Sequence, residues 1–99
     1  MRRAAKVDAN HQAIVACFKA CGARVLSLAG LGDGVPDLLV EKGGRLILVE
    51  VKDGAKPPSA RKLTPDQEKW HAEWSGAPVY VVEDIEQAVG VLVKARATV

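Results

Sequence analysis

The sequence predicts one α/β domain, in which helices cover both faces of a mixed central sheet. Two apolar runs separated by a glycine pair indicate a β-hairpin. Segments with helix start and stop signals on both sides of the hairpin indicate the covering helices. A chain of 99 residues can bury one modest core, so we expect a single domain over 1–99.

Periodicity and end signals predict the order helix, three strands, helix, strand, helix (αβββαβα). The expected elements are a helix over 9–21, strands over 24–28, 35–40 and 46–52, a helix over 65–75, a strand over 79–82 and a helix over 85–95. Residues 1–7 are basic and aperiodic, which predicts a loose arm. Asp8, Thr64 and Asp84 stand where N-caps are needed, and Gln67 completes a capping box with Thr64.

The glycine pair Gly43-Gly44 sets the expected register of the hairpin. A two-residue turn there places Asp37 opposite Glu50, on one face of the sheet, with Cβ atoms ~5 Å apart. Lys52 follows Glu50 by two positions and therefore shares that face. Two carboxylates this close repel each other unless a proton or a cation lies between them, and a divalent metal is the simplest solution.

The balance of charge does not by itself indicate a nucleic-acid-binding protein. The chain has 14 basic and 12 acidic residues, a net charge of +2. The distribution is more informative, because Lys56, Arg61 and Lys62 flank the acidic pair and Arg3 lies in the basic arm. Positive charge beside a metal site suits a phosphate-bearing substrate. The alternative is that these residues belong to a solvated loop and tail.

Compartment and redox state can also be predicted. No apolar run reaches the ~18 residues of a membrane span and no signal peptide is visible, so we expect a cytoplasmic protein without membrane contact. Cys17 and Cys21 lie four residues apart on a predicted helix, which is too far for a disulfide. No further zinc ligands occur at matching spacing, so we expect both to pack as small apolar thiols.

Three segments resemble a known family of nucleases. Pro36-Asp37, followed by Glu50-Val51-Lys52, resembles the signature of the PD-(D/E)XK superfamily. More narrowly, the chain resembles the small stand-alone VRR-NUC (virus-type replication–repair nuclease) domains of phages. That resemblance covers roughly residues 8 to 93 and is carried by 34–38, 48–52 and 63–67, with Trp70 downstream. It implies a restriction-endonuclease-like core.

The resemblance also implies roles for individual residues. Asp37 and Glu50 would bind Mg²⁺ or Mn²⁺, with the backbone carbonyl of Val51 as a third oxygen ligand. Lys52 would orient or deprotonate the attacking water, or stabilise developing charge. Gln67 matches a glutamine near the site of the family.

Two assignments stay open at this point. The family usually adds an acidic residue from the first helix. Here Asp8 stands at the helix start, Asn10 and His11 lie one turn inward and could serve instead, and Asp8 or Asn10 is expected to reach the metal. The capping box alone would explain Gln67, so that residue has either a structural or a catalytic role.

The implied function is a metal-dependent, structure-selective DNA endonuclease, acting as a homodimer on branched, Holliday-junction-like DNA. If the protein is of phage origin, it would act in the host cytoplasm. Two other classes compete with this interpretation. The first is a catalytically inactive nuclease fold that binds DNA or a host protein. The second is a structural ion triad in which Lys52 neutralises Asp37 and Glu50.

Overall fold

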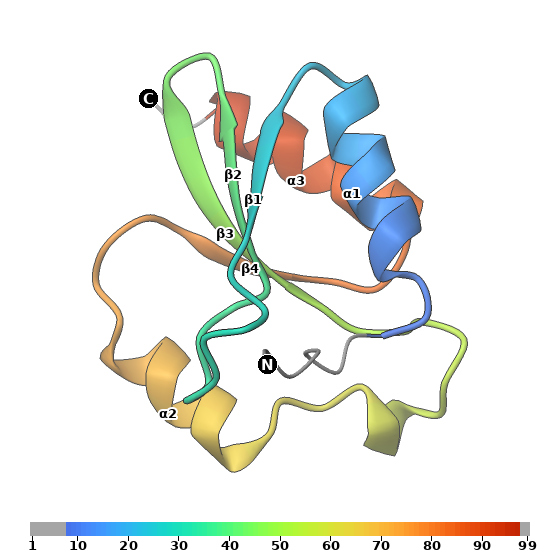
Figure 1. The fold of residues 1–99 in the computed structure, drawn as a ribbon, viewed down its shortest axis with the longest axis vertical. Coiled ribbons are helices and arrows are strands. Elements are labelled where there is room, and N and C mark those ends of the chain that lie inside the picture. The colour runs from blue at the N-terminus through green and yellow to red at the C-terminus, as the bar shows by residue number, and fades with distance from the viewer. Residues whose placement is uncertain (1–7, 98–99) are drawn as a thin grey trace, which may run out of the picture.

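The computed structural model describes residues 8–97, with side chains over 8–95. The arm predicted over 1–7, and Arg3 with it, lies outside the described residues. The elements follow in the order α1 (His11–Ala20), β1 (Arg24–Ser27), β2 (Leu38–Lys42), β3 (Arg45–Val51), η1 (Pro58–Ala60), α2 (Pro65–Glu73), β4 (Val79–Val82) and α3 (Ile85–Ala97). This confirms the predicted order of helices and strands and adds the short 3-10 helix η1 (Figure 1).

The strands form one four-stranded mixed sheet in the order β1-β2-β3-β4. The first three strands pair antiparallel, and β4 runs parallel to β3. The hairpin has the predicted register, with Lys42 opposite Arg45 and Leu39 opposite Leu48. Gly43 and Gly44 have φ values of 60° and 82°, the left-handed conformation that a tight two-residue turn requires at both positions.

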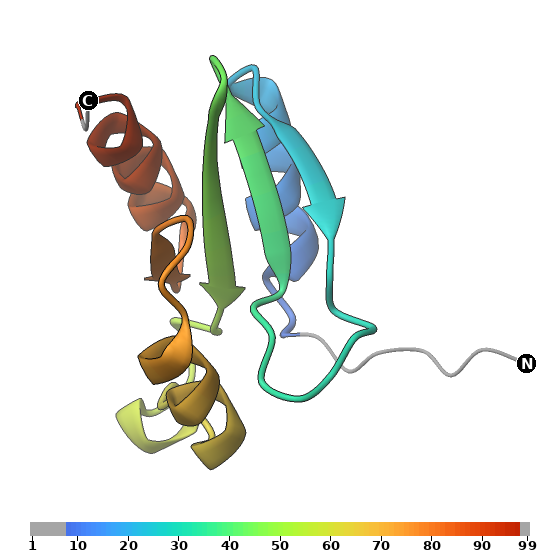
Figure 2. The same ribbon diagram turned by 90° about the vertical axis from the view of Figure 1, so that its left-hand side faces the viewer.

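Helices α1 and α3 pack side by side on one face of the sheet (Figures 1 and 2). Alternate residues of each strand point toward them and form the core together with apolar residues of the two helices. The fully buried members of this core are Ile14, Phe18, Leu38, Val49, Val82 and Ala88. Apolar periodicities of two in the strands and of 3.6 in the helices produce this layer.

The opposite face of the sheet is buried only toward α2, at Leu48, Glu50 and Lys52, and is otherwise open, so the prediction that helices cover both faces fails over most of this face. Leu26, Leu46 and Val81 point to this side and are 59%, 49% and 39% exposed. Helix α2 lies beyond one end of the strands instead of over them (Figure 2). The apolar residues on this face predict a covered surface, but no helix among the described residues lies over Leu26, Leu46 and Val81.

Three local features differ from the prediction or refine it. Asp8 is not the N-cap of α1, because Asn10 occupies that position and only the backbone carbonyl of Asp8 accepts a bond from His11 N–H. The strand predicted to start at 35 begins at Leu38, since Pro36 has no N–H to donate. The N-caps Thr64 and Asp84 are confirmed by bonds to the backbone N–H groups three residues on.

The remaining predictions about the described residues concern the thiols and the membrane. Cys17 and Cys21 are free and half-buried. Cys17 packs against the hydrophobic core as predicted. Burial raises the pKa of the Cys17 thiol, and the neighbouring Cys21 adds to that effect. Within residues 8–97, no helix combines the length and the apolar character that crossing a bilayer demands.

Candidate active site

The hairpin brings Asp37 and Glu50 together at the end of the sheet that lies near α2. Leu38 pairs with Val49, and continuing this register by one position sets Asp37 across from Glu50. Asp37 Oδ2 accepts a 2.8 Å hydrogen bond from the N–H of Val51, which fixes the carboxylate against β3. The Glu50 side chain is buried, with 2% of the residue exposed. The predicted acidic pair is therefore formed.

Gln67 connects this pair to Lys52. Its Oε1 accepts a 2.8 Å bond from Lys52 Nζ, and its Nε2 donates a 3.1 Å bond to Glu50 Oε2. The same Oε1 accepts from the N–H of Thr64 at 2.9 Å, and Thr64 Oγ1 accepts from the N–H of Gln67 at 3.2 Å. The sequence left a structural and a site role for Gln67 as alternatives. One side chain completes the capping box and also bridges Lys52 and Glu50, so the structural role is confirmed and the catalytic role stays a prediction.

The electrostatics of the site are dominated by burial of negative charge. Burial and the nearby Asp37 carboxyl together raise the pKa of Glu50 from 4.5 to about 8, although the charge of Lys52 opposes the shift. Lys52 is 8% exposed, and its Nζ lies 4.0 Å from Glu50 Oε2. One ammonium group at this distance does not neutralise the two carboxylates of Asp37 and Glu50, so the site favours an added proton or cation.

The donor groups fit a hard divalent ion. Glu50 Oε1 is buried and has no hydrogen-bond partner, so a ligating oxygen remains free beside Asp37. No group of three His, Cys, Asp or Glu side chains positioned to hold a metal is found among residues 8–95. Two carboxylates completed by a backbone carbonyl and water are a ligand set that Mg²⁺ and Mn²⁺ accept.

The two first-helix candidates have other contacts in the structure. Asn10 Nδ2 donates to the carbonyls of Lys52, at 3.0 Å, and Glu83, at 2.8 Å. Its Oδ1 is buried without a partner. The carboxylate of Asp8 lies 3.4 Å from Lys56 Nζ. Asn10 therefore holds the ends of β3 and β4 beside the site, and a metal contact of either residue stays a prediction.

A comparison with solved structures identifies the family. A VRR-NUC domain of known structure superposes with a TM-score of 0.60 and 32% sequence identity, over 84% of this chain and 89% of that chain. The chain belongs to the VRR-NUC domain family. Comparisons with family profiles and with curated proteins found no match. The three segments that carry the resemblance, 34–38, 48–52 and 63–67, converge in the present VRR-NUC domain. Asp37 accepts a hydrogen bond from Val51 N–H, and Gln67 accepts one from Lys52.

The basic residues predicted to contact DNA differ in their surroundings. Arg61 is half-buried and pairs with Glu83 at 3.2 Å, and Lys56 pairs with Asp8. Lys62 is exposed on the same loop. These ion pairs hold the loop after β3 against β4 and the start of α1, and phosphate contacts by the three residues stay a prediction.

His71 on α2 also lies near the site, close enough to Lys52 for the two charges to interact. Burial lowers the pKa of His71, and the charge of Lys52 lowers it further. Its position one turn after Gln67 on α2 is the signal that could have placed it there. The lowered pKa disfavours a second cation beside Lys52.

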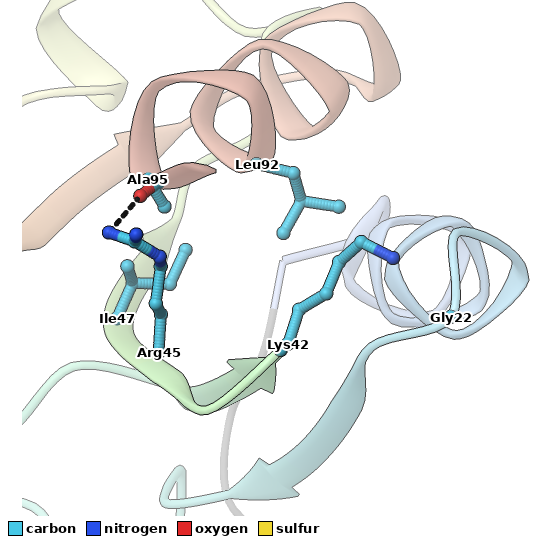
Figure 3. Close-up of a pocket in the computed structure, with 7 residues that line it drawn as sticks. Gly22, Lys42, Arg45, Ile47, Leu92 and Ala95 are labelled. Carbon is cyan, nitrogen blue, oxygen red and sulfur yellow. Dashed lines mark hydrogen bonds between the residues drawn. The ribbon is translucent and has the colours of Figure 1, made fainter. Parts of the chain in front are cut away.

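A pocket that is separate from this site lies between the hairpin, α1 and α3 (Figure 3). Its volume is about 650 Å³, and it lies at the hairpin tip, at the other end of the strands. Lys42 Nζ donates to the carbonyl of Cys21 at 2.6 Å, and the Arg45 guanidinium to that of Ala95 at 3.3 Å. Both cations therefore cap the last carbonyls of a helix, where the helix dipole favours positive charge.

Proposed function

We propose that this VRR-NUC domain is a Mg²⁺- or Mn²⁺-dependent endodeoxyribonuclease of the PD-(D/E)XK type. The observation that supports it is the crowded pair of Asp37 and Glu50 beside a buried Lys52 that Gln67 holds in place. An ion triad built only for stability would gain little from burying two acids against one cation. The proposed substrate is branched DNA such as a four-way junction.

The side chains have distinct tasks in this proposal. Asp37, Glu50 and the Val51 carbonyl would hold the ion, which supplies Lewis-acid chemistry and lowers the pKa of bound water. Lys52 donates one N–H to Gln67 and retains other donors to orient the attacking water or a phosphate oxygen. Gln67 limits the freedom of both Lys52 and Glu50, so the reacting groups need little reorganisation.

The proposal predicts metal-dependent cleavage with a preference for DNA structure. Four-way junctions, flaps, nicked duplexes and single strands of matched sequence are incubated with Mg²⁺, Mn²⁺, Ca²⁺ or EDTA. We expect cleavage with Mg²⁺ or Mn²⁺ only, fastest on the junction, because the two carboxylates need a hard cation to act. Binding of DNA without cleavage under all conditions would instead support the inactive nuclease fold.

We further propose that the active form is a homodimer, with the open face of the sheet as its interface. Leu26, Leu39, Leu48 and Val79 are cross-strand partners, so an apolar row crosses this face from edge to edge. Arg24 and Glu41 are opposite each other in the register of β1 and β2, beside that row. A twofold axis could bring the Arg24 of one copy to the Glu41 of the other. A second copy would cover the apolar row and would bring two sites to two strands of a junction.

Leu26→Lys is expected to dissociate this dimer. Leu26 is 59% exposed on the open face, and a lysine there would place like charges against each other at a twofold interface. The matched control is Leu31→Lys, because Leu31 is 64% exposed but lies in the loop before β2. Sedimentation velocity should give a dimer for the wild type and the control and a monomer for Leu26→Lys. A wild-type monomer at all concentrations would exclude the homodimer.

A further inference from the structure

We propose that Gly34 is a positioning residue, which acts by letting the loop before β2 press against the first turn of α2. This inference rests on the proposed function, because it concerns the alignment of Lys52 by Gln67. Gly34 lies three residues before Asp37, and the atoms nearest to a Cβ built there belong to the backbone of Asp66 and Gln67 and not to the acidic pair. Its effect on the site would therefore be transmitted through α2.

The contact leaves no space for a side chain at this position. A Cβ at Gly34 would overlap the carbonyl oxygen of Asp66, and it would lie 2.5 Å from the carbonyl carbon of Asp66 and 2.9 Å from the backbone nitrogen of Gln67. These are backbone atoms in the first turn of a helix, so they cannot rotate away as the end of a flexible side chain would. Any side chain must therefore push the turn and the loop apart.

The displaced turn carries Gln67, whose side chain reaches the site through short bonds. Its bonds to Lys52 and Glu50 measure 2.8 Å and 3.1 Å, and shifts of ~1 Å exceed what such bonds tolerate. The loop is fixed at its other end, because Leu28 N–H donates to the carbonyl of Asp37 at 2.7 Å. The loop thus links the strand that carries one acid to the helix that holds Lys52.

Gly32 provides a matched control within the same loop. Gly32 and Gly34 have φ values of 71° and 79°, so alanine at either position suffers a similar backbone strain. A Cβ at Gly32, however, would meet no atom within 4 Å. The difference between Gly32→Ala and Gly34→Ala therefore isolates the contact with α2 from the strain of the loop.

The kinetic test compares both variants on the best substrate of the cleavage panel. We expect Gly34→Ala to lower kcat by ~10- to 100-fold with KM little changed, because misplacing a catalytic group by ~1 Å has effects of this size. Gly32→Ala should keep kcat within about threefold of the wild type. In a double-mutant cycle, Gly34→Ala should add no loss in kcat to Gln67→Ala, since both act through one side chain. Additive losses, or a wild-type kcat in Gly34→Ala, would overturn the proposal.

A second readout does not require activity. The side-chain amide signals of Gln67 can be assigned in NMR spectra by their absence from the spectrum of Gln67→Glu. In the wild type and in Gly32→Ala these signals should be shifted from free-glutamine values and should exchange slowly with solvent. In Gly34→Ala they should approach free-glutamine values. Unchanged signals in Gly34→Ala would refute the positioning role even if no DNA is cut. A wild type that cuts nothing would refute only the proposed function. If Gly34→Ala does not fold, Thr64→Val is measured in its place, because it removes the cap that holds the same turn of α2. Gln67 amide signals in Thr64→Val that match those of the wild type would then refute the positioning role.

Discussion

Replacing Lys52 with methionine is expected to reduce metal-dependent DNA cleavage by a factor of ~10²–10⁴. Methionine keeps an unbranched apolar side chain in a position that is 8% exposed, but it removes the ammonium group that donates to Gln67. The fold should persist below about pH 8, because Glu50 already holds a proton there and does not depend on the cation. Single-turnover cleavage of a junction substrate with saturating Mn²⁺ measures the effect on chemistry.

The control for this variant is Lys19→Met, which removes the same charge from an exposed position in the last turn of α1. Its cleavage rate should match that of the wild type. Circular dichroism and melting at pH 6 in EDTA should show that Lys52→Met is folded at the assay temperature. A folded Lys52→Met protein that cuts at the wild-type rate would remove the lysine from the mechanism.

The second large effect concerns stability without metal, which should fall as the pH rises. Burial and the nearby Asp37 carboxyl raise the pKa of Glu50 from 4.5 to about 8. Between these values the folded protein holds a proton that the unfolded chain has released, so the free energy of unfolding decreases with increasing pH. The contribution is complete below pH 4.5 and is lost by about pH 8. One such proton limits the slope to ~1.4 kcal/mol per pH unit.

Urea unfolding at fixed temperature between pH 5 and pH 9 in EDTA measures this slope. Glu50→Gln should flatten the curve, because glutamine does not titrate. Asp37→Asn should reduce the slope while keeping an oxygen that accepts from the N–H of Val51. Saturating Mg²⁺ should restore stability most strongly above pH 8, since the ion replaces the proton between the acids. Parallel curves for the wild type and Glu50→Gln would show that Glu50 titrates normally.

The local part of the site could be predicted from sequence. Gly43-Gly44 requires a turn of defined length and conformation, and the period of two in a strand then determines which residues face each other. Asp37, Glu50 and Lys52 were placed by this argument alone, and their convergence follows from the observed register. Thr64, Pro65 and Gln67 likewise predict the start of α2, because capping depends on neighbouring residues only.

The long-range part could not be predicted. Asp8 and Asn10 are both good N-caps, and the choice between them depends on the carbonyls of Lys52 and Glu83, which hold the amide of Asn10. The open face of the sheet has the apolar pattern of a covered one, and the pattern does not say whether a helix or a second chain covers it. The approach of Gly34 to α2 joins segments that no periodicity relates.

The tight turn at Gly43-Gly44 has a consequence for how the chain can change length. Strand residues alternate between faces, so one inserted residue after the turn would reverse the side to which every later position of β3 points. Glu50 would then face the helices while Asp37 stayed on the other side. Insertions in the loops after β3 are free of this parity constraint, so lineages of this protein should vary in length there and not at the hairpin tip.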